Sequence, residues 1–360
     1  LVYNLKGMAK RQNQNGKKKI TIYDVANALN VSISTVSRAL NESPRINPNT
    51  IKRVKKMSEK MGFQKNALAS GLMTNSTKTL GVIVPHINSD FFAQVVRSIE
   101  DTAFSKGYTV LICQSHDSFE KEKVNINTLI SSRVDGILVS LSLETTEYEH
   151  FQKAIDADIP IVFFDRAFLP FDNTTKIIVD NFSSAYKATE HLINKGYKRI
   201  GHIGGPLKRK QFESRLNGYK QALLDNNLVV DEEIIEQADL TQKDCYRAAQ
   251  KTLNAKNPPD AILCANHLTS INTIFYAMSL KKAVPKDIAV LGFSESPIAE
   301  LIVPSLTAIR QPCADMGRIA TQKLIEEIEF DHTNEKYVHS TITLDTQLDI
   351  RNSTDPEYAL

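Results

Sequence analysis

The sequence predicts a small all-α head with a helix-turn-helix, joined to a larger α/β body whose parallel sheets form two lobes. The distribution of charge supports this division. Residues 1–65 carry 14 Lys and Arg against three acidic residues, a net charge of +11, so the other 295 residues carry a net charge of −8. The pattern of apolar residues supports it too. Apolar residues recur at helical spacing in the head, whereas β-branched runs alternate with amphipathic stretches in the body. At 360 residues, the chain exceeds what one core usually supports.

Composition narrows the class of protein. With 42% hydrophobic and 24% charged residues, the chain is neither disordered nor collagen-like. Its apolar runs, such as Ile159–Phe164, are far shorter than the ~20 residues of a membrane helix, and its start has no apolar signal segment. We therefore expect a cytoplasmic chain without a membrane partner. The cysteines contain no C-x-x-C pair, so we expect buried apolar side chains at Cys113, Cys245, Cys264 and Cys313.

No catalytic constellation is present in the sequence. The run GHIGG at residues 201–205 is not the dinucleotide fingerprint G-x-G-x-x-G, and no Walker A, H-E-x-x-H or G-x-S-x-G run occurs. The eight histidines are scattered without the spacing of metal ligands. We expect no enzymatic activity, no cofactor and no metal.

The head follows a polar, unpatterned segment, residues 1–19, which we expect to be a disordered basic tail. Thr21 and Asp24 form a variant of the capping box that starts a first helix. Ser32 is expected to cap a second helix, and Asn47 with the following proline to start a third that ends at Gly62. The apolar positions that predict the buried faces are Ile22, Val25, Ala26 and Leu29, then Val36, Ala39 and Leu40, then Ile51, Val54, Met57 and Met61.

Three short helices with a tight turn between the first two suit the major groove of DNA, which admits one helix. Ser34, Thr35 and Arg38 on the second helix are short polar or arginine side chains able to reach base edges. Basic side chains would lie over phosphates and supply affinity without sequence information. These are Lys17, Lys18, Lys19, Lys52, Lys55 and Lys56. A three-helix protein–protein module remains the alternative.

Two runs, IYDVA at residues 22–26 and VSISTVSRALN at residues 31–41, resemble the head of LacI/GalR-family transcriptional regulators. The segment NALASGL, residues 66–72, resembles the family's hinge helix, whose leucine, here Leu72, is wedged between base pairs from the minor groove. Lys65 stands where a proline is common, and Gly71 lowers helix propensity, so we expect this hinge to depend more on DNA for folding. A linker leucine packed on the body is the alternative for Leu72. The resemblance implies DNA contacts at Thr21, Tyr23, Ser32, Ile33, Ser34, Thr35, Ser37, Arg38, Asn41 and Leu72.

The body alternates buried strands with amphipathic helices, which indicates parallel sheets covered on both faces. Strands of the first lobe are predicted at residues 80–85, 109–114, 136–140 and 160–165, with helices at 91–106, 120–132 and 148–157. Strands of the second lobe are predicted at residues 177–180, 199–205, 234–237, 261–265 and 288–293, with helices at 183–195, 215–226, 243–253 and 270–281.

The resemblance extends over residues 20–352 and implies the periplasmic-binding-protein fold, in which the chain crosses between the lobes three times. Residues 313–329 would then return to the first lobe and residues 341–351 to the second. The expected divisions are a tail at 1–19, a DNA-binding domain at 20–64, a hinge and linker at 65–78, a two-lobed effector-binding and dimerisation domain at 79–353, and a tail at 354–360.

Ligands of open parallel sheets bind beyond the carboxyl ends of the strands. That rule selects residues 88–92, Asp165 with Arg166, Asn266 with His267, and Ser294. Arg215, expected to open a helix after a glycine turn, is a further candidate. Among these, the resemblance assigns effector contacts to Phe91, Phe92, Asp165, Arg215 and Asn266. The alternatives are core packing for the two phenylalanines, a cap for Asp165 and a surface ion pair for Arg215.

Two positions depart from the family pattern. Ser294 and His267 stand where many relatives have aspartate, which accepts hydrogen bonds from sugar hydroxyls. Loss of two carboxylates beside Arg166 and Arg215 predicts a more positive pocket, and hence an anionic effector such as a sugar acid or sugar phosphate.

The sequence thus predicts a regulator, a repressor, that binds a palindromic operator in double-stranded DNA as a homodimer and is controlled allosterically by a small metabolite, a sugar or sugar acid. A solute-binding receptor without a DNA role is the alternative. It would share the body, but it would not need the basic head.

Overall fold

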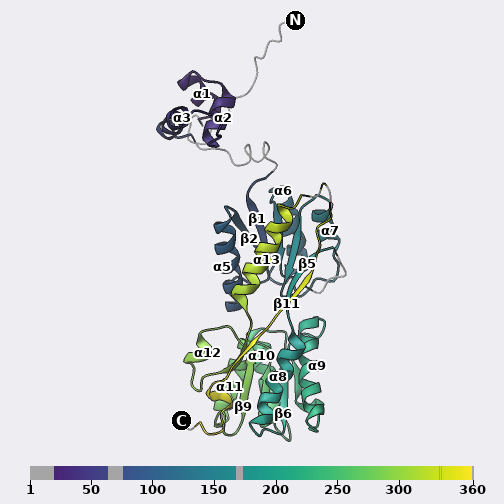
Figure 1. Ribbon diagram of the computed structural model, residues 1–360. Coiled ribbons are helices and arrows are strands. Elements are labelled where there is room, and N and C mark those ends of the chain that lie inside the picture. The colour runs from purple at the N-terminus through teal and green to yellow at the C-terminus, as the bar shows by residue number, and fades with distance from the viewer. Residues whose placement is uncertain (1–19, 64–75, 168–172, 332, 334, 359–360) are drawn as a thin grey trace. The chain divides into compact units, whose positions relative to one another are not determined.

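A computed structural model of the chain describes residues 20–63, 76–167, 173–331, 333 and 335–358 (Figure 1). The chain forms two compact units, residues 1–77 and 78–360. The predicted basic tail, most of the hinge, and Leu72 lie outside the described residues. No helix among the described residues is long and apolar enough to cross a membrane.

The described part of the first unit is a three-helix module, as predicted. It contains α1 (Ile22–Leu29), α2 (Ile33–Leu40) and α3 (Pro48–Met61). The capping box is present, because Asp24 N donates to the Thr21 side chain while the Asp24 carboxylate accepts from Thr21 N. Gly62 ends α3 in the left-handed conformation, with φ of 68°. The fully buried side chains of the module are those of Val25, Val36, Ala39 and Val54.

The second unit contains two six-stranded, mostly parallel sheets, one in each lobe. The first sheet has the order β11-β5-β4-β3-β1-β2. Its strands are β1 (Thr79–Val84), β2 (Thr109–Gln114), β3 (Gly136–Val139), β4 (Ile161–Phe164), β5 (Thr175–Val179) and β11 (Thr341–Leu344). The helices of this lobe are α5 (Asp90–Ser105), α6 (Phe119–Ser131), α7 (Glu149–Ile155) and α13 (Cys313–Ile328).

The second sheet has the order β12-β10-β9-β8-β6-β7, in which only β12 runs antiparallel to its neighbour. Its strands are β6 (Ile200–Gly204), β7 (Ile235–Gln237), β8 (Ala261–Cys264), β9 (Ala289–Phe293), β10 (Thr307–Arg310) and β12 (Gln347–Asp349). The helices are α8 (Asn181–Asn194), α9 (Lys210–Asp225), α10 (Gln242–Leu253), α11 (His267–Ser279) and α12 (Ile298–Leu301), with short 3₁₀ turns η1 (Glu232–Ile234) and η2 (Asn352–Thr354).

The order of strands confirms three crossings between the lobes, but it corrects two assignments. The strand predicted at residues 177–180 belongs to the first sheet, because β5 pairs with β4. Residues 341–351 do not all lie in the second lobe, because β11 pairs with β5 whereas β12 pairs with β10. The prediction also lacks β10 and α12. A run of apolar residues indicates that a strand is buried, but it does not indicate which sheet contains the strand.

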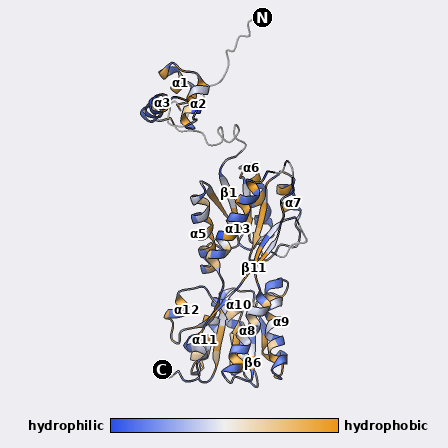
Figure 2. Ribbon diagram, viewed as in Figure 1, coloured by the Kyte–Doolittle hydropathy of each residue, from blue (hydrophilic) through white to orange (hydrophobic). Residues whose placement is uncertain are grey.

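Each sheet is enclosed by apolar cores on both faces, and Figure 2 shows the strands coloured mostly as hydrophobic. As predicted, α13 returns to the first lobe, where its buried residues pack with α5 and β4. The carboxyl ends of the strands in each lobe therefore carry the loops that hold the candidate pocket.

Candidate functional site

In the first unit, a group of hydroxyls lies at the exposed start of α2. Ser32 Oγ accepts a hydrogen bond from Thr35 N at 3.1 Å, which confirms Ser32 as the cap. The same oxygen lies 2.8 Å from both Ser34 Oγ and Thr35 Oγ1. These hydroxyls are fixed by the helix start and can bond a further polar group, because each combines a donor with two acceptor lone pairs.

The exposed surface around the start of α2 also contains larger polar and apolar side chains. Tyr23 is 62% exposed and Ile33 39%, so both side chains are accessible to a partner. Arg38 is also exposed, because Val36 and Ala39 take the buried face of α2. The remaining described candidates, Thr21, Ser37 and Asn41, are at least partly exposed. Among the predicted phosphate-contacting lysines, Lys55 forms an ion pair with Glu42.

In the second unit, Asp165 and Arg166 directly follow β4. Asp165 adopts a positive φ of 57° and is nearly buried. Burial raises the pKa of its carboxyl, although the neighbouring Arg166 and Arg215 oppose the shift. Arg166 donates to the Asp117 carboxylate and, at 3.4 Å, to the carbonyl of Leu141. The guanidinium of Arg166 is therefore partly neutralised within its own lobe.

Arg215 comes from the second lobe and is 6% exposed, which rules out the surface ion pair. It does not open its helix, because α9 begins at Lys210. Its Nε donates to Asn181 Oδ1 at 2.8 Å and its Nη1 to the carbonyl of Ala265 at 2.7 Å. Its guanidinium also stacks 3.5 Å from the ring centre of Phe293. Burial lowers its pKa to about 10, so it remains charged at neutral pH.

Asn266, His267 and Ser294 gather at the ends of β8 and β9. Asn266 Oδ1 caps α11 by accepting from Thr269 N at 2.9 Å, while its amide donors have no partner among the described residues. His267 Nδ1 and Ser294 Oγ lie 2.9 Å apart. Burial lowers the pKa of His267, which favours the neutral ring, and Asp90 at the start of α5 in the other lobe opposes this.

Phe91 and Phe92 start α5 with their rings in edge-to-face contact, 5.0 Å between centres. They are 8% and 4% exposed and belong to the core of the first lobe. The guanidinium carbon of Arg166 lies 5.6 Å from the ring centre of Phe92. Phe92 thus packs in the core and also faces a cation of the candidate pocket.

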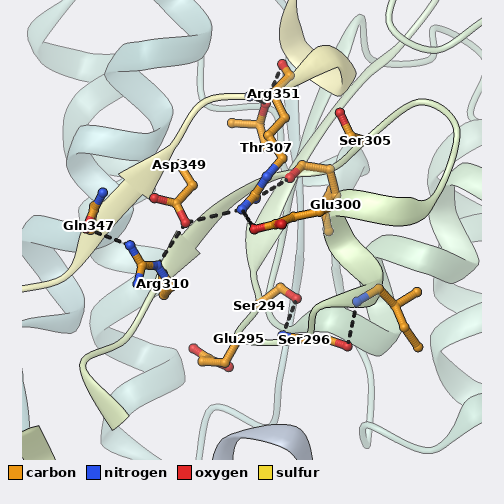
Figure 3. A network of polar contacts seen from close by, with 12 residues as sticks. Ser294, Glu295, Ser296, Glu300, Ser305, Thr307, Arg310, Gln347, Asp349 and Arg351 are labelled. Atoms are coloured by element: carbon orange, nitrogen blue, oxygen red, sulfur yellow. Dashed lines mark hydrogen bonds and ion pairs between the residues drawn. The ribbon is translucent and has the colours of Figure 1, made fainter. Parts of the chain in front are cut away.

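Three polar residues of this region were not predicted. Arg209 donates across the lobes to the carbonyl of Thr145 at 3.0 Å, and its buried Nε has no hydrogen-bond partner among the described residues. Asp117 holds Arg166. Glu295 follows Ser294 and supplies a carboxyl one residue beyond the position at which many relatives have aspartate. The strand-end rule had the signal to find Glu295, because it stands one residue beyond Ser294 at the end of β9 (Figure 3).

A second polar network fixes the last crossing between the lobes (Figure 3). Arg310 Nε and Arg351 Nη2 both donate to Asp349, at 2.9 and 3.2 Å, and Arg351 also bonds Glu300 at 2.9 Å. These pairs tie β12 to β10 and to α12. The backbone after the crossing is therefore anchored to the sheet that carries Ser294 and Glu295.

Comparison with known proteins gives matches over both units. Residues 21–66 match the family described as bacterial regulatory proteins, lacI family, and residues 189–354 match a periplasmic binding protein-like domain. The HTH-type transcriptional repressor PurR of Proteus mirabilis (strain HI4320) is 33% identical over 311 residues, which cover 86% of this chain and 90% of that protein. Catabolite control protein A of Priestia megaterium is 31% identical over 337 residues, or 93% and 99% of the two chains.

Solved structures give the same relation. The transcriptional regulator CelR in complex with cellobiose is 27% identical, with a TM-score of 0.70 over 93% of this chain and 99% of that one. The lac repressor dimer bound to operator and the anti-inducer ONPF has a TM-score of 0.81 over 94% and 99% of the chains, at 23% identity. The second likeness concerns the fold alone.

Proposed function

Because this chain belongs to the LacI family of bacterial regulatory proteins, we propose that it is a transcriptional repressor that binds a palindromic operator as a homodimer and responds to a small metabolite. The observation that carries the proposal is the exposed face of α2 on a strongly basic unit: fixed hydroxyls and Ile33 lie at the start of the helix, and Arg38 is exposed in its last turn. Its relatives are transcriptional regulators, which favours regulation over catalysis.

DNA recognition is assigned to α2. Arg38 is long enough to bond the major-groove edge of guanine, and Ile33 offers an apolar surface to a thymine methyl group. Ser32, Ser34 and Thr35 present hydroxyls to phosphates or bases. Lys52 and Lys56 are exposed on α3 and suit phosphate contacts, whereas Lys55 must first leave Glu42. Leu72 remains the proposed minor-groove wedge.

The effector is assigned to the strand ends of the two lobes. Asp165 and Arg166 come from one lobe, and Arg215, Asn266, His267 and Ser294 from the other, so a ligand bound to both sets would favour one arrangement of the lobes. The proposed ligand is a carbohydrate or an anionic sugar derivative. Phe91 and Phe92 would contact it only through the edge of the lobe core, since both are buried.

The proposal is tested with Arg38→Ala and Lys52→Ala, on an operator selected from random duplexes and on a random duplex of equal length. We expect Arg38→Ala to weaken specific binding at least about tenfold and to leave random binding nearly unchanged, since one bidentate base contact contributes about 1–3 kcal/mol. Lys52→Ala should weaken both and reduce the slope of log affinity against log salt by about one. Gel-shift titrations over a range of salt concentrations measure these changes. Equal losses for Arg38→Ala on both duplexes would contradict its role in base recognition.

A further inference from the structure

Lys78 is the first residue of the second unit, and its backbone is held on both sides. Its N donates to Asp135 Oδ2 at 3.0 Å, and its carbonyl accepts from Thr109 N at 2.8 Å. Thr109 begins β2 and Asp135 directly precedes β3, the two strands that flank β1 in the sheet. Lys78 has a φ of 50°, in the left-handed region that residues other than glycine rarely adopt. The point where the chain enters β1 is therefore fixed in both position and direction.

The side chain of Lys78 joins this point to the end of α13. Its Nζ donates to Tyr108 Oη at 3.0 Å and to Glu329 Oε1 at 3.3 Å, and it lies 4.2 Å from the centre of the Tyr108 ring. Tyr108 is buried in the core of the first lobe, and Glu329 directly follows the last residue of α13. The hydrogen bonds to Tyr108 and Glu329 raise the pKa of Lys78 against the effect of burial, so the amine stays charged near neutral pH.

The helix α13 connects Lys78 to the second crossing between the lobes. It begins two residues beyond Gln311, which lies at that crossing, and it packs closely against α5. A Cβ added at Gly317 would lie 2.5 Å from the carbonyl oxygen of Val95 on α5. Because close-packed elements transmit a displacement rather than absorb it, a shift of α13 at the crossing would also move Glu329, and with it the contact to Lys78.

The geometry of DNA makes the position of this point important for the proposed operator. One inserted base pair adds about 3.4 Å of rise and about 34–36° of rotation between two half-sites. One extended residue spans about 3.3–3.6 Å, so release of a single residue from the sheet in each subunit would be enough to follow that insertion. A linker that leaves a fixed point accepts a narrow range of spacings, whereas a longer or looser linker accepts a wider range.

We propose that Lys78 is a positioning residue that fixes where each DNA-binding unit joins the body and thereby sets the spacing between half-sites that the homodimer accepts. This inference rests on the proposed binding of a palindromic operator, and it names the residue that limits the geometry of that binding. Lys78 acts through the protein groups that hold it, not through a contact with DNA.

The test compares duplexes that differ only in spacing. An operator is selected from random duplexes with the wild-type protein, and its centre is then lengthened by one or two base pairs or shortened by one. In gel-shift titrations of the full chain, each change should weaken wild-type binding about tenfold or more. Lys78→Met keeps the length of the side chain but loses its charge and its donors, so each change should weaken binding only about threefold or less. Lys78→Arg keeps the charge and the donors and should keep the wild-type selectivity.

Lys106→Met is the matched control, because Lys106 is an exposed lysine of the same lobe, two residues before Tyr108. It should keep the wild-type selectivity. Loss of stability alone cannot imitate the expected result, because a smaller folded fraction weakens binding to every duplex by the same factor and leaves the ratios unchanged. If Lys78→Met does not fold, as judged by circular dichroism, the double variant Tyr108→Phe with Glu329→Gln is used. It removes the hydroxyl and the charge that hold the Lys78 side chain and should broaden the accepted spacing in the same way.

The inference would be overturned if Lys78→Met were as selective for spacing as the wild-type protein, if Lys106→Met lost the selectivity, or if Lys78→Arg did not keep it. A wild-type protein that accepts every spacing equally, but still prefers two half-sites to one, would overturn the inference and leave the proposed function intact. A wild-type protein that binds the palindrome no better than a single half-site would contradict the proposed binding by a homodimer, and the inference with it.

Discussion

Single side chains of the candidate effector site serve two purposes at once. Asn266 uses its carbonyl oxygen to cap α11 and keeps its amide donors for another partner. Arg215 donates to Asn181 and Ala265 and also stacks on the ring of Phe293. Because the folded chain already holds these groups in place, a ligand would lose little binding energy to ordering them.

Glu327, in the last turn of α13, permits a prediction of how stability depends on pH. Burial raises its pKa to about 7, and its Oε2 lies 3.9 Å from His339 Nδ1, with neither atom hydrogen-bonded among the described residues. Burial also lowers the pKa of His339, which therefore supplies little charge. In the unfolded chain, Glu327 loses its proton near pH 4.5, whereas in the folded chain it keeps the proton to about pH 7. Stability therefore falls as pH rises through this window.

Glu327→Gln removes this titration. Relative to the wild-type protein, the variant should be close to neutral at pH 4.5 and more stable by about 1–2 kcal/mol at pH 8, after discounting the shift for solvent screening. Urea unfolding of both proteins across pH 4.5–8 measures the difference. A difference that is independent of pH would mean that the carboxyl titrates normally in the fold.

Packing between helices depends on glycines at close approaches. At Gly218 on α9, an added Cβ would lie 2.2 Å from the carbonyl oxygen of Phe182 and 3.1 Å from Tyr186 N, both on α8. These are backbone atoms, so they can yield only if the two helices separate. Gly218→Ala should destabilise the second lobe by about 1–3 kcal/mol, despite the higher helix propensity of alanine.

The neighbouring residue provides the control for this change. Asn217→Ala alters an exposed side chain on the same turn of α9 and should shift stability by no more than about 0.5 kcal/mol. Thermal unfolding of the two variants compares them directly. If Gly218→Ala were as stable as Asn217→Ala, the close contact between α8 and α9 would not be needed for their packing.

Local signals in the sequence predicted the helices and strands well, but they did not predict which strands pair when those strands are distant in the chain. The capping box at Thr21, the cap at Ser32 and the stop at Gly62 act within four residues, and the structure contains all three. The strand at Thr307–Arg310 was missed because it ends in an exposed arginine, which interrupts the apolar run, and it follows a proline-containing loop. The division of residues 341–351 between two sheets depends on contacts with β5 and β10, which no local pattern encodes.

In the candidate site, too, local features could be predicted from the sequence and distant contacts could not. The ends of β4, β8 and β9 were located from the pattern of strands, so Asp165, Asn266 and Ser294 could be selected from the sequence. The hydrogen-bond partners of the site residues could not be predicted from the sequence. The bonds of Arg166 to Asp117 and of Arg209 to Thr145 join residues that are 49 and 64 positions apart. Glu295 could not be singled out in the same way, because its carboxyl is held by Gln311, 16 positions further along the chain.

The three crossings set how the two lobes can influence each other. The chain passes between the sheets after β5, after β10 and after β11. Gln311, at the second crossing, is bonded by Glu295. The second crossing is therefore tied by hydrogen bonds to the loop that follows β9. By linkage, if the effector changes affinity for DNA, DNA must change affinity for the effector by the same factor.

Pairing of two copies is required if the operator is a palindrome, and exposed apolar side chains of the second unit suggest where they meet. Leu301 on α12 is 79% exposed and Val303 56%, while Ile112 on β2 is 48% exposed. Leu301 and Val303 lie only two positions apart in the chain, and neighbouring exposed apolar side chains are typical of interfaces. Leu301→Glu should place a charge in the contact and raise the dissociation constant of the dimer about thirtyfold or more, as expected for loss of a central contact of about 2 kcal/mol.

Val229→Glu is the matched control, because Val229 is 82% exposed but lies in the loop between α9 and η1, away from these residues in the sequence. Sedimentation equilibrium should find the control dimeric and Leu301→Glu shifted toward monomer. Monomers would bind a half-site about as well as before but lose the advantage of the full palindrome, since the second head no longer binds as part of the same molecule. Leu301→Glu could instead keep its preference for the palindrome and form a dimer that dissociates no more readily than the control. That result would exclude α12 from the interface.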